Sequence, residues 1–313
     1  MLSAIKYFRS LAYVLLCTYA LFPFACGAEN LKVIVLLSDN SAPYLTFATV
    51  LNKNLPAQAR TTVLEHPDQL SPDAPPPDLI VAVGIKAAEA AIAQGRAPIL
   101  AAMIPRASYE DLRDKAPSRK SAPSISAIYL NQPWDRQLDF LRAAIPKRHK
   151  IGLLYSAESQ IDIAPLRQNI SSRGNSLLAK AINSAAELSP VLESVLAGSE
   201  VLLAIPDKTI YSSSNIRNIL LTSYRHNVPL IGLSQAYVNA GALCAIFSTP
   251  EQLAEQTGVT VTSFVQTRRL PEPQYPLDFT IAVNQQVARS LGIELPSLEA
   301  IRSRMGKGKE ENN

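Results

Sequence analysis

Residues 199–247 contain three short apolar runs, and no other feature restricts the fold of this chain as strongly. The runs are Val201–Ile205, Pro229–Leu233 and Ala242–Phe247. Between the first two, residues 212–224 begin with three serines that can cap a helix and continue with apolar residues at helical spacing. Short apolar strands that alternate with amphipathic helices are typical of a parallel sheet covered by helices. Ligands bind beyond the carboxyl ends of the strands in such sheets, so we expect the site there.

The same alternation divides the rest of the chain into two α/β series. The predicted strands of the first series lie at residues 31–37, 61–64, 79–83, 98–104 and 125–130, and those of the second at 151–155, 177–182, 201–205, 229–233, 242–247 and 277–283. Helices are expected between most of them, whereas residues 107–124, with their prolines and charges, are expected to be exposed. With 313 residues and 47% hydrophobic content, the chain is large enough for two domains with a sizeable core.

Residues 1–28 have the three parts of a secretory signal peptide. Lys6 and Arg9 precede the apolar run Leu11–Ala25, and small residues follow at 25–28. An uncleaved membrane anchor is the competing interpretation. The apolar run is shorter than the roughly 20 residues that span a bilayer, which favours cleavage and export to the periplasm.

The cysteines bear on the cleavage site. Lipidation of Cys26 is an alternative to simple cleavage, but Phe24 fits the small-residue pattern of lipoprotein signals poorly. Cleavage after Ala28 would remove Cys17 and Cys26 and leave only Cys244, which lies in an apolar run and is expected to be a small buried hydrophobe. One cysteine cannot form an internal disulfide, so the exported domain must depend on its core.

The charge of the chain does not favour a nucleic-acid partner. The 30 basic and 26 acidic residues include Lys6 and Arg9 near the start and four basic and two acidic residues in the tail 302–313. The body between these ends therefore carries 24 of each. Binding to nucleic acid needs a concentrated basic face, and the tail is expected to be a flexible, solvated end.

Motifs of catalysis are missing from the sequence. The three histidines, His66, His149 and His226, have no cysteine, histidine or carboxylate at metal-ligand spacing. There is no Gly-x-Ser-x-Gly elbow, phosphate loop or Gly-x-Gly-x-x-Gly fingerprint. We therefore expect no enzyme, no metal and no cofactor.

Four longer motifs carry a resemblance to a known family. They are RQLDFLRAAIPKRHKIGLLYS (136–156), EVLLAIPDKTI (200–210), NVPLIGLSQAYVNAGALCAIF (227–247) and DFTIAVNQQVARSLGIELP (278–296). With the twin α/β series, they make the chain similar to type I periplasmic solute-binding proteins. More narrowly, it resembles the ABC transporter substrate-binding family whose known members bind amino acids, including tryptophan.

The resemblance implies two Rossmann-like lobes with parallel sheets, joined by three chain crossings near Ile125, Phe247 and Phe279. Lobe 1 would comprise residues 29–125 and 248–278, lobe 2 residues 126–247 and 279–301, and the flexible tail residues 302–313. It further implies a monomer that captures a small solute, an amino acid or similar molecule, in the interlobe cleft for an ABC-type importer and its permease. The alternative is a periplasmic sensor or accessory partner of a membrane receptor or signalling protein.

The first lobe departs from the family's pattern. Where relatives have a Gly-Thr pair after the third strand, this chain has Gly84-Ile85, and a Thr-Asp-Pro-like turn is replaced by Ile104-Pro105-Arg106. The equivalent positions help to hold the solute in relatives. The departure therefore bears on which solute is bound, and Arg106 could contact an anionic solute or lie on the solvated surface.

Asp207 is the first of seven candidate ligand-binding residues. The resemblance implies that it faces the cleft, where its carboxylate could pair with an ammonium group or accept a hydroxyl. Alternatively, it caps the following turn, because aspartate is favoured there for its local backbone hydrogen bonds.

The other six candidates also lie at predicted strand ends. Ser38, Asn40 and Gly84 follow first-lobe strands, where helix amino termini present free N–H groups to anions, although generic loop residues would look the same. The remaining three are Tyr129, Tyr155 and Ser234. A tyrosine can stack on a planar solute and donate its hydroxyl, but buried core tyrosines are equally common.

Overall fold

The strands form two sheets that differ in the number and direction of their strands. The computed structural model describes residues 31–116, 124–156, 159 and 161–310, so the predicted signal peptide lies outside the described residues. The first sheet has five strands in the order β2-β1-β3-β4-β5, all parallel. The second has six in the order β11-β10-β9-β8-β6-β7, parallel except for the antiparallel pair β10 and β11. The prediction of two α/β lobes with mainly parallel sheets is confirmed.

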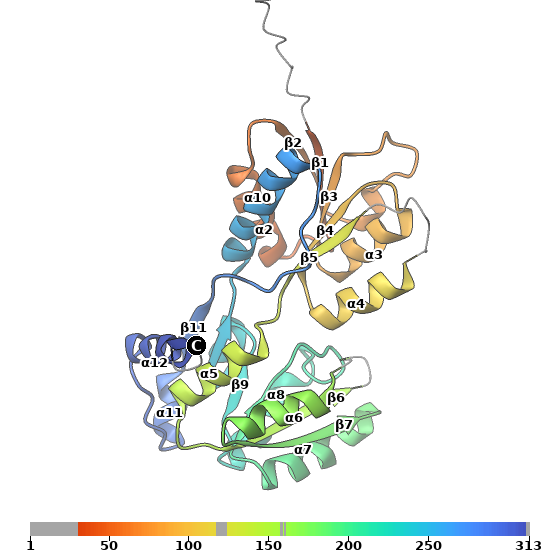
Figure 1. The fold of residues 1–313 in the computed structure, drawn as a ribbon. Helices are drawn as coiled ribbons and strands as arrows, with labels where there is room; N and C mark the ends of the chain where they lie inside the picture. Colours follow the sequence, from red (N-terminus) through yellow and green to blue (C-terminus); the bar gives the residue numbers. More distant parts are fainter. Residues whose placement is uncertain (1–30, 117–123, 157–158, 160, 311–313) are drawn as a thin grey trace, which may run out of the picture. The chain divides into compact units, whose positions relative to one another are not determined.

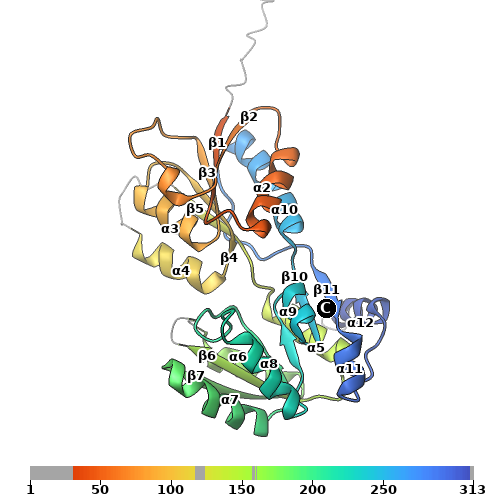
Figure 2. The same cartoon turned by 180° about the vertical axis from the view of Figure 1, so that it is seen from behind.

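The first sheet is built from apolar strands covered by helices on both faces (Figure 1). All side chains of β3 and β4 are buried, as expected for the centre of a parallel sheet. The helix α10 packs along α2, although about 200 residues separate them, so this lobe is completed by a late segment of the chain (Figures 1 and 2). Its elements are β1 (Leu31–Leu37), α2 (Ala42–Asn54), β2 (Ala59–Leu64), η1 (Pro67–Gln69), β3 (Leu79–Val83), α3 (Ile85–Gln94), β4 (Ile99–Ile104), α4 (Arg106–Lys115), β5 (Ile125–Tyr129) and α10 (Pro250–Thr267).

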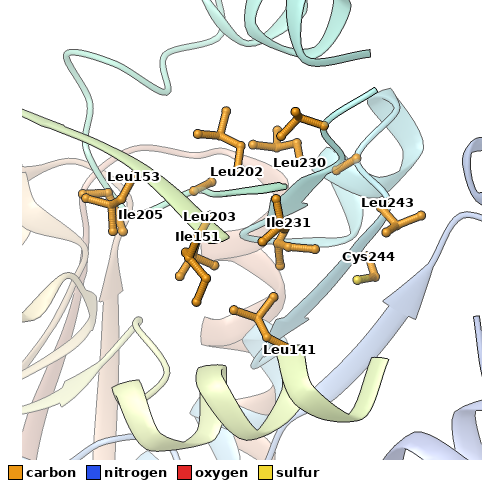
Figure 3. Packing of buried hydrophobic residues seen from close by; sticks show 14 of the residues in the cluster. Leu141, Ile151, Leu153, Leu202, Leu203, Ile205, Leu230, Ile231, Leu243 and Cys244 are labelled. Carbon is orange, nitrogen blue, oxygen red and sulfur yellow. The ribbon is translucent and has the colours of Figure 1, made fainter. Parts of the chain in front are cut away.

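The second sheet and the helices packed on it contain the larger hydrophobic core. Aliphatic side chains from neighbouring strands and from α5 meet there, among them Leu141, Leu203 and Ile231, and Cys244 lies among them (Figure 3). Cys244 is fully buried, and this burial raises the pKa of its thiol. The elements of this lobe are α5 (Trp134–Ala144), β6 (Lys150–Ser156), α6 (Ile163–Ser172), β7 (Ser176–Ile182), η3 (Ala185–Glu187), α7 (Leu188–Ala197), β8 (Val201–Leu203), α8 (Ile216–Arg225), β9 (Leu230–Gly232), α9 (Gln235–Ala240), β10 (Cys244–Phe247), β11 (Thr280–Val283), α11 (Gln285–Ser290) and α12 (Leu298–Glu310).

Three details differ from the expectations. Strand β5 pairs with β4, so the first crossing follows Tyr129 instead of lying near Ile125. Residues 106–115 form α4, which buries Tyr109 alone and therefore shows little apolar periodicity. The expected flexible tail is helical as far as Glu310, because α12 packs on α5 and buries Ile301.

No helix in the described ranges combines the length and apolarity needed to cross a bilayer. The chain from Leu31 onward forms one compact unit. The crossings between its two sheets run through residues 130–133, 248–249 and 268–279. Any hollow at the carboxyl ends of the strands is therefore bordered by both lobes and by these crossings.

Candidate functional site

Three hollows lie at the carboxyl ends of the strands, and Pro206, just after β8, lines all of them. We name them the amide hollow, the hinge hollow and the tyrosine hollow, with volumes of about 420, 540 and 650 Å³. The amide and hinge hollows share Asn131, Gln132 and Gln137, and the hinge and tyrosine hollows share Met103, Leu130, Leu233 and Tyr237. We call this continuous space the cleft.

The hinge hollow has apolar walls and a partly polar mouth. Its walls come from the ends of β4, β5, β8, β9 and β10, where parallel strands place their ligands. Apolar wall residues are Met103, Leu130, Phe140, Leu203, Ile231, Leu233, Ile246 and Phe247. Glu251 is the one ionisable carboxylate that lines this hollow, and it is exposed in the first turn of α10.

A buried hydrogen-bond network joins all three crossings at the floor of this space. Gln132, 5% exposed, donates from Nε2 to Ser248 Oγ over 2.8 Å and accepts at Oε1 from Arg136 over 2.6 Å. Ser248 in turn donates to the carbonyl of Asp278, and Arg136 donates to the carbonyl of Pro276. Burial lowers the pKa of the Arg136 guanidinium, and the nearby Asp278 partly offsets this.

Two further carboxamides, of Asn131 at the first crossing and of Gln137 near the start of α5, each have one group bonded and one group unbonded. Asn131 Oδ1 accepts from the N–H of Arg106 over 2.8 Å, and Gln137 Nε2 donates to the carbonyl of Gln132 over 2.9 Å. Because a backbone N–H only donates and a carbonyl only accepts, these bonds fix which way each amide points. The other two groups, Asn131 Nδ2 and Gln137 Oε1, form no hydrogen bond within the described part of the chain.

Met103 is in the left-handed region, with φ of 53°, at a register shift between β4 and β5. Few residues other than glycine adopt this conformation, which costs on the order of 1–3 kcal/mol and persists where the surroundings enforce it. The side chain is 8% exposed and lines both the hinge and tyrosine hollows. The strained backbone of Met103 therefore lies at a wall of the cleft, which no sequence pattern indicated.

Asp207 lies in the wall of the tyrosine hollow and is 5% exposed. Its carboxylate accepts from three backbone N–H groups, those of Ser156 (2.7 Å), Thr209 (3.0 Å) and Ile210 (3.1 Å). Both interpretations of the sequence thus describe the same residue: Asp207 caps its turn and also borders the cleft. Contact with a solute stays a prediction.

Ser38 and Gly84 meet at the start of α3, and Tyr44 covers them. Ser38 Oγ donates to the carbonyl of Val83 (2.9 Å) and accepts from the N–H of Ala87 (3.1 Å). A Cβ at residue 84 would lie 2.5 Å from the Tyr44 hydroxyl oxygen and 2.6 Å from Ser38 Oγ. Burial raises the pKa of the Tyr44 phenol, and Asp39 adds to the effect. Tyr44 lines the tyrosine hollow, although no sequence pattern singled it out.

The remaining predicted residues are scattered. Ser234 begins α9 and lines the hinge hollow, whereas exposed Asn40 lines none of the three hollows. Tyr129 is 6% exposed and packs edge-on against Tyr109 and Tyr275, in the core of the first lobe. Tyr155 is half-buried against the second core. For these residues too, contact with a solute stays a prediction.

Ionisable side chains around the cleft are largely engaged with each other. Arg106 Nε lies 2.7 Å from Glu110, its Nη1 donates to Tyr275 Oη, and its guanidinium lies over the Tyr275 ring. Lys115 is paired with Asp111 over 2.7 Å. The described residues contain no group of three or more histidine, cysteine or acidic side chains placed to hold a metal ion.

Tyr211 presents a different feature of the tyrosine hollow. Its side chain is 6% exposed, and its hydroxyl has no hydrogen-bond partner among the described residues. Burial raises the pKa of this phenol, with smaller contributions from Tyr237 and Asp207. A hydroxyl without a partner in the wall of a cleft could not have been located from the sequence, because its isolation depends on packing.

Comparison with known families gives one match. The model of a family described as ABC transporter substrate binding protein matches residues 57–304. The chain therefore belongs to the ABC transporter substrate-binding protein family, whose members are solute-binding proteins rather than enzymes. No curated protein matches the chain.

Solved structures resemble the fold at low sequence identity. A substrate binding protein with adhesive properties from Clostridium difficile, in a ligand-free, open structure, has a TM-score of 0.65 and 20% identity, covering 86% of this chain and 97% of its own. An ABC domain in complex with L-Trp from Streptococcus pneumonia has 0.63 and 17%, covering 87% and 98%. A conserved domain protein from Vibrio cholerae has 0.62 and 17%, covering 88% and 98%. At these identities the likeness establishes the fold alone.

Proposed function

We propose that this member of the ABC transporter substrate-binding family captures a small solute in its cleft and delivers it to an ABC permease. The observation that carries the proposal is the meeting of three hollows at Pro206, at the carboxyl ends of strands from both sheets. Volumes of about 420–650 Å³ suit a small molecule, since ligand pockets commonly measure roughly 300–1,000 Å³.

The crossings explain how binding would act on the protein. A solute that touches both lobes stabilises the closed form, because only that form makes both sets of contacts. The Gln132–Ser248–Arg136 network joins the three crossings and borders the hinge hollow, so a solute there lies directly on the segments that must bend. A permease would then bind the closed form.

Export belongs to the same proposal. The basic, apolar and small-residue parts of residues 1–28 support cleavage and release into the periplasm, where solutes enter the cleft. The neutral body of the chain supports a small-molecule ligand over a nucleic acid.

The test combines identification and measurement of the solute. The protein is purified from a periplasm, its small molecules are identified by mass spectrometry, and thermal unfolding is followed with a panel of amino acids, small acids, sugars, amides and heterocycles. Bound solute raises the melting temperature according to its occupancy. A melting temperature that no compound shifts would contradict solute capture.

A bulky residue in the cleft provides the specific control. Ala236→Trp fills the hinge hollow from the start of α9, and we expect it to abolish the shift. Ala240→Trp introduces the same side chain at an exposed position of the same helix that lines none of the three hollows, and it should retain the shift.

A further inference from the structure

We propose that the cleft selects an uncharged solute with an apolar body and an amide or lactam group, and excludes the carboxylate of an amino acid. The inference rests on the proposed function, since it names the class of solute. Four observations lead to it, each about the groups that a charged solute would require.

A solute carboxylate finds no unpaired cation among the residues that line the amide and hinge hollows, and Lys208, which lines the tyrosine hollow, is exposed to water. The Arg106 guanidinium is already bonded to Glu110 and to the Tyr275 hydroxyl. Lys115 is paired with Asp111, and Lys208 is exposed at the rim. Burying an anion without a partner is unfavourable enough to exclude it from the apolar hinge hollow.

Of the helix amino termini at the cleft, which are the other common anion sites, those of α3, α6 and α10 are covered or carry their own carboxylate. Asp162 caps α6, and Glu251 lies in the first turn of α10, so both termini repel an anion. At α3, Tyr44 fills the space above Gly84, and Ser38 accepts the Ala87 N–H. The amino terminus of α3 is therefore covered by this chain's own side chains.

A solute ammonium also lacks its expected partner. Asp207 is the buried carboxylate of the cleft wall, and three backbone N–H groups already bond to it. Of the remaining lining carboxylates, Glu110 and Asp111 are paired with Arg106 and Lys115. Water screens the other three, which are exposed: Glu89, Asp162 and Glu251. A zwitterion would thus leave both of its charges without a buried counterpart.

Where the amide and hinge hollows meet, one amide donor and one amide acceptor are available. Asn131 Nδ2 and Gln137 Oε1 line the amide and hinge hollows together, and their orientations are fixed by their other bonds. A carboxamide or lactam offers a carbonyl to the first and an N–H to the second. Its apolar remainder would lie against Met103, Leu130 and Ile246 in the hinge hollow.

The experiment compares solutes that share a body and differ in charge. One series is phenylacetamide, phenylacetate, phenethylamine and phenylalanine, and the other is isovaleramide, isovalerate, isoamylamine and leucine, each titrated by calorimetry. We expect the amide of at least one series to bind about tenfold or more tightly than its charged counterparts.

A matched pair of variants locates the effect. Asn131→Asp keeps the acceptor for the Arg106 N–H and removes the free donor, so amide affinity should fall about tenfold. Asn239→Asp is the control: it adds the same charge on the exposed side of α9 and keeps the acceptor for Gln235, so amide affinity should be unchanged.

The outcomes separate the two proposals. Tighter binding of an acid, amine or amino acid, or equal amide affinity in Asn131→Asp and the original chain, would overturn the solute class and leave solute capture intact. A charged molecule or a sugar as the only hit in the broader panel would do the same. No binding in either series or in the broader panel would contradict solute capture itself.

Discussion

Gln132 Nε2 donates a hydrogen bond to Ser248 Oγ over 2.8 Å and thereby connects the first and second crossings between the lobes. The two residues are 116 positions apart in the sequence, and both are buried at the edge of the hinge hollow. A bond at this place connects the wall of the hinge hollow, the proposed solute site, to two of the segments that join the lobes.

Gln132→Leu should lower the free energy of unfolding by about 1–3 kcal/mol, because Arg136 loses a buried acceptor. Urea unfolding measures this change. Gln266→Leu, at an exposed position of α10, should leave stability nearly unaffected. Equal effects of the two substitutions would show that the buried network contributes nothing.

Asp207→Asn should reduce stability by about 1–3 kcal/mol and leave solute affinity within about twofold of the original. The amide cannot accept from all three N–H groups that the carboxylate holds, so stability should fall. The proposed uncharged solute does not pair with the carboxylate, so its affinity should change little. Thermal unfolding and calorimetry give the two quantities separately. A large loss of affinity with unchanged stability would instead make Asp207 a direct partner of the solute.

Gly84→Ala should destabilise the first lobe more than Gly174→Ala does. Both glycines have positive φ, 85° and 75°, so both substitutions carry a backbone cost, and Gly84, with ψ of 177°, lies in a region that essentially only glycine adopts. Only at residue 84 does the added Cβ meet neighbours, while nothing lies within 4 Å of the position at residue 174. We expect a difference of about 1–3 kcal/mol in denaturant unfolding. Equal losses would mean that Tyr44 does not pack over Gly84.

Stability should fall as pH rises from about 10 to about 12, partly through Tyr109. Burial raises the pKa of this phenol to about 12, with Tyr129 adding to the effect. Between the unfolded and folded pKa values the unfolded chain releases a proton that the folded chain keeps, so unfolding is favoured. Tyr109→Phe should reduce this pH dependence, and exposed Tyr224→Phe should retain it in thermal scans.

Ile301→Ala should cost about 2–5 kcal/mol, because the side chain is fully buried where α12 packs on α5. Ser303→Ala, on the exposed side of the same helix, should cost much less. Chemical denaturation compares the two. Equal small effects would mean that this segment behaves as the flexible tail that its charges and glycines suggest.

Much of the fold follows from local pattern. Strands β1 and β3 lie at the predicted residues, because continuous apolar runs are buried on both faces of a parallel sheet. The sequence pattern did not predict helices α4 and α12, because each buries very few side chains against the rest of the chain. Their helical state depends on tertiary packing that periodicity does not reveal.

The site was less predictable than the fold. Topology brings strand ends together, and Asp207 and Ser234 line the tyrosine and hinge hollows, while their contact with a solute stays a prediction. Asn131 lies at the first crossing and Gln137 near the start of α5, and only their hydrogen bonds show which group of each amide is left unbonded. In the sequence, the polar pair at 131–132, between a strand and a helix, was the available indication of these carboxamides.

Small-angle scattering during a calorimetric titration tests the central claim most directly. With residues 29–313 and the solute that co-purifies, we expect saturable binding of one solute per chain. The radius of gyration should decrease along the same saturation curve, because the bound solute stabilises closure. Saturable heat in the original chain that persists in Ala236→Trp, or no saturable heat with any compound, would contradict binding in the cleft.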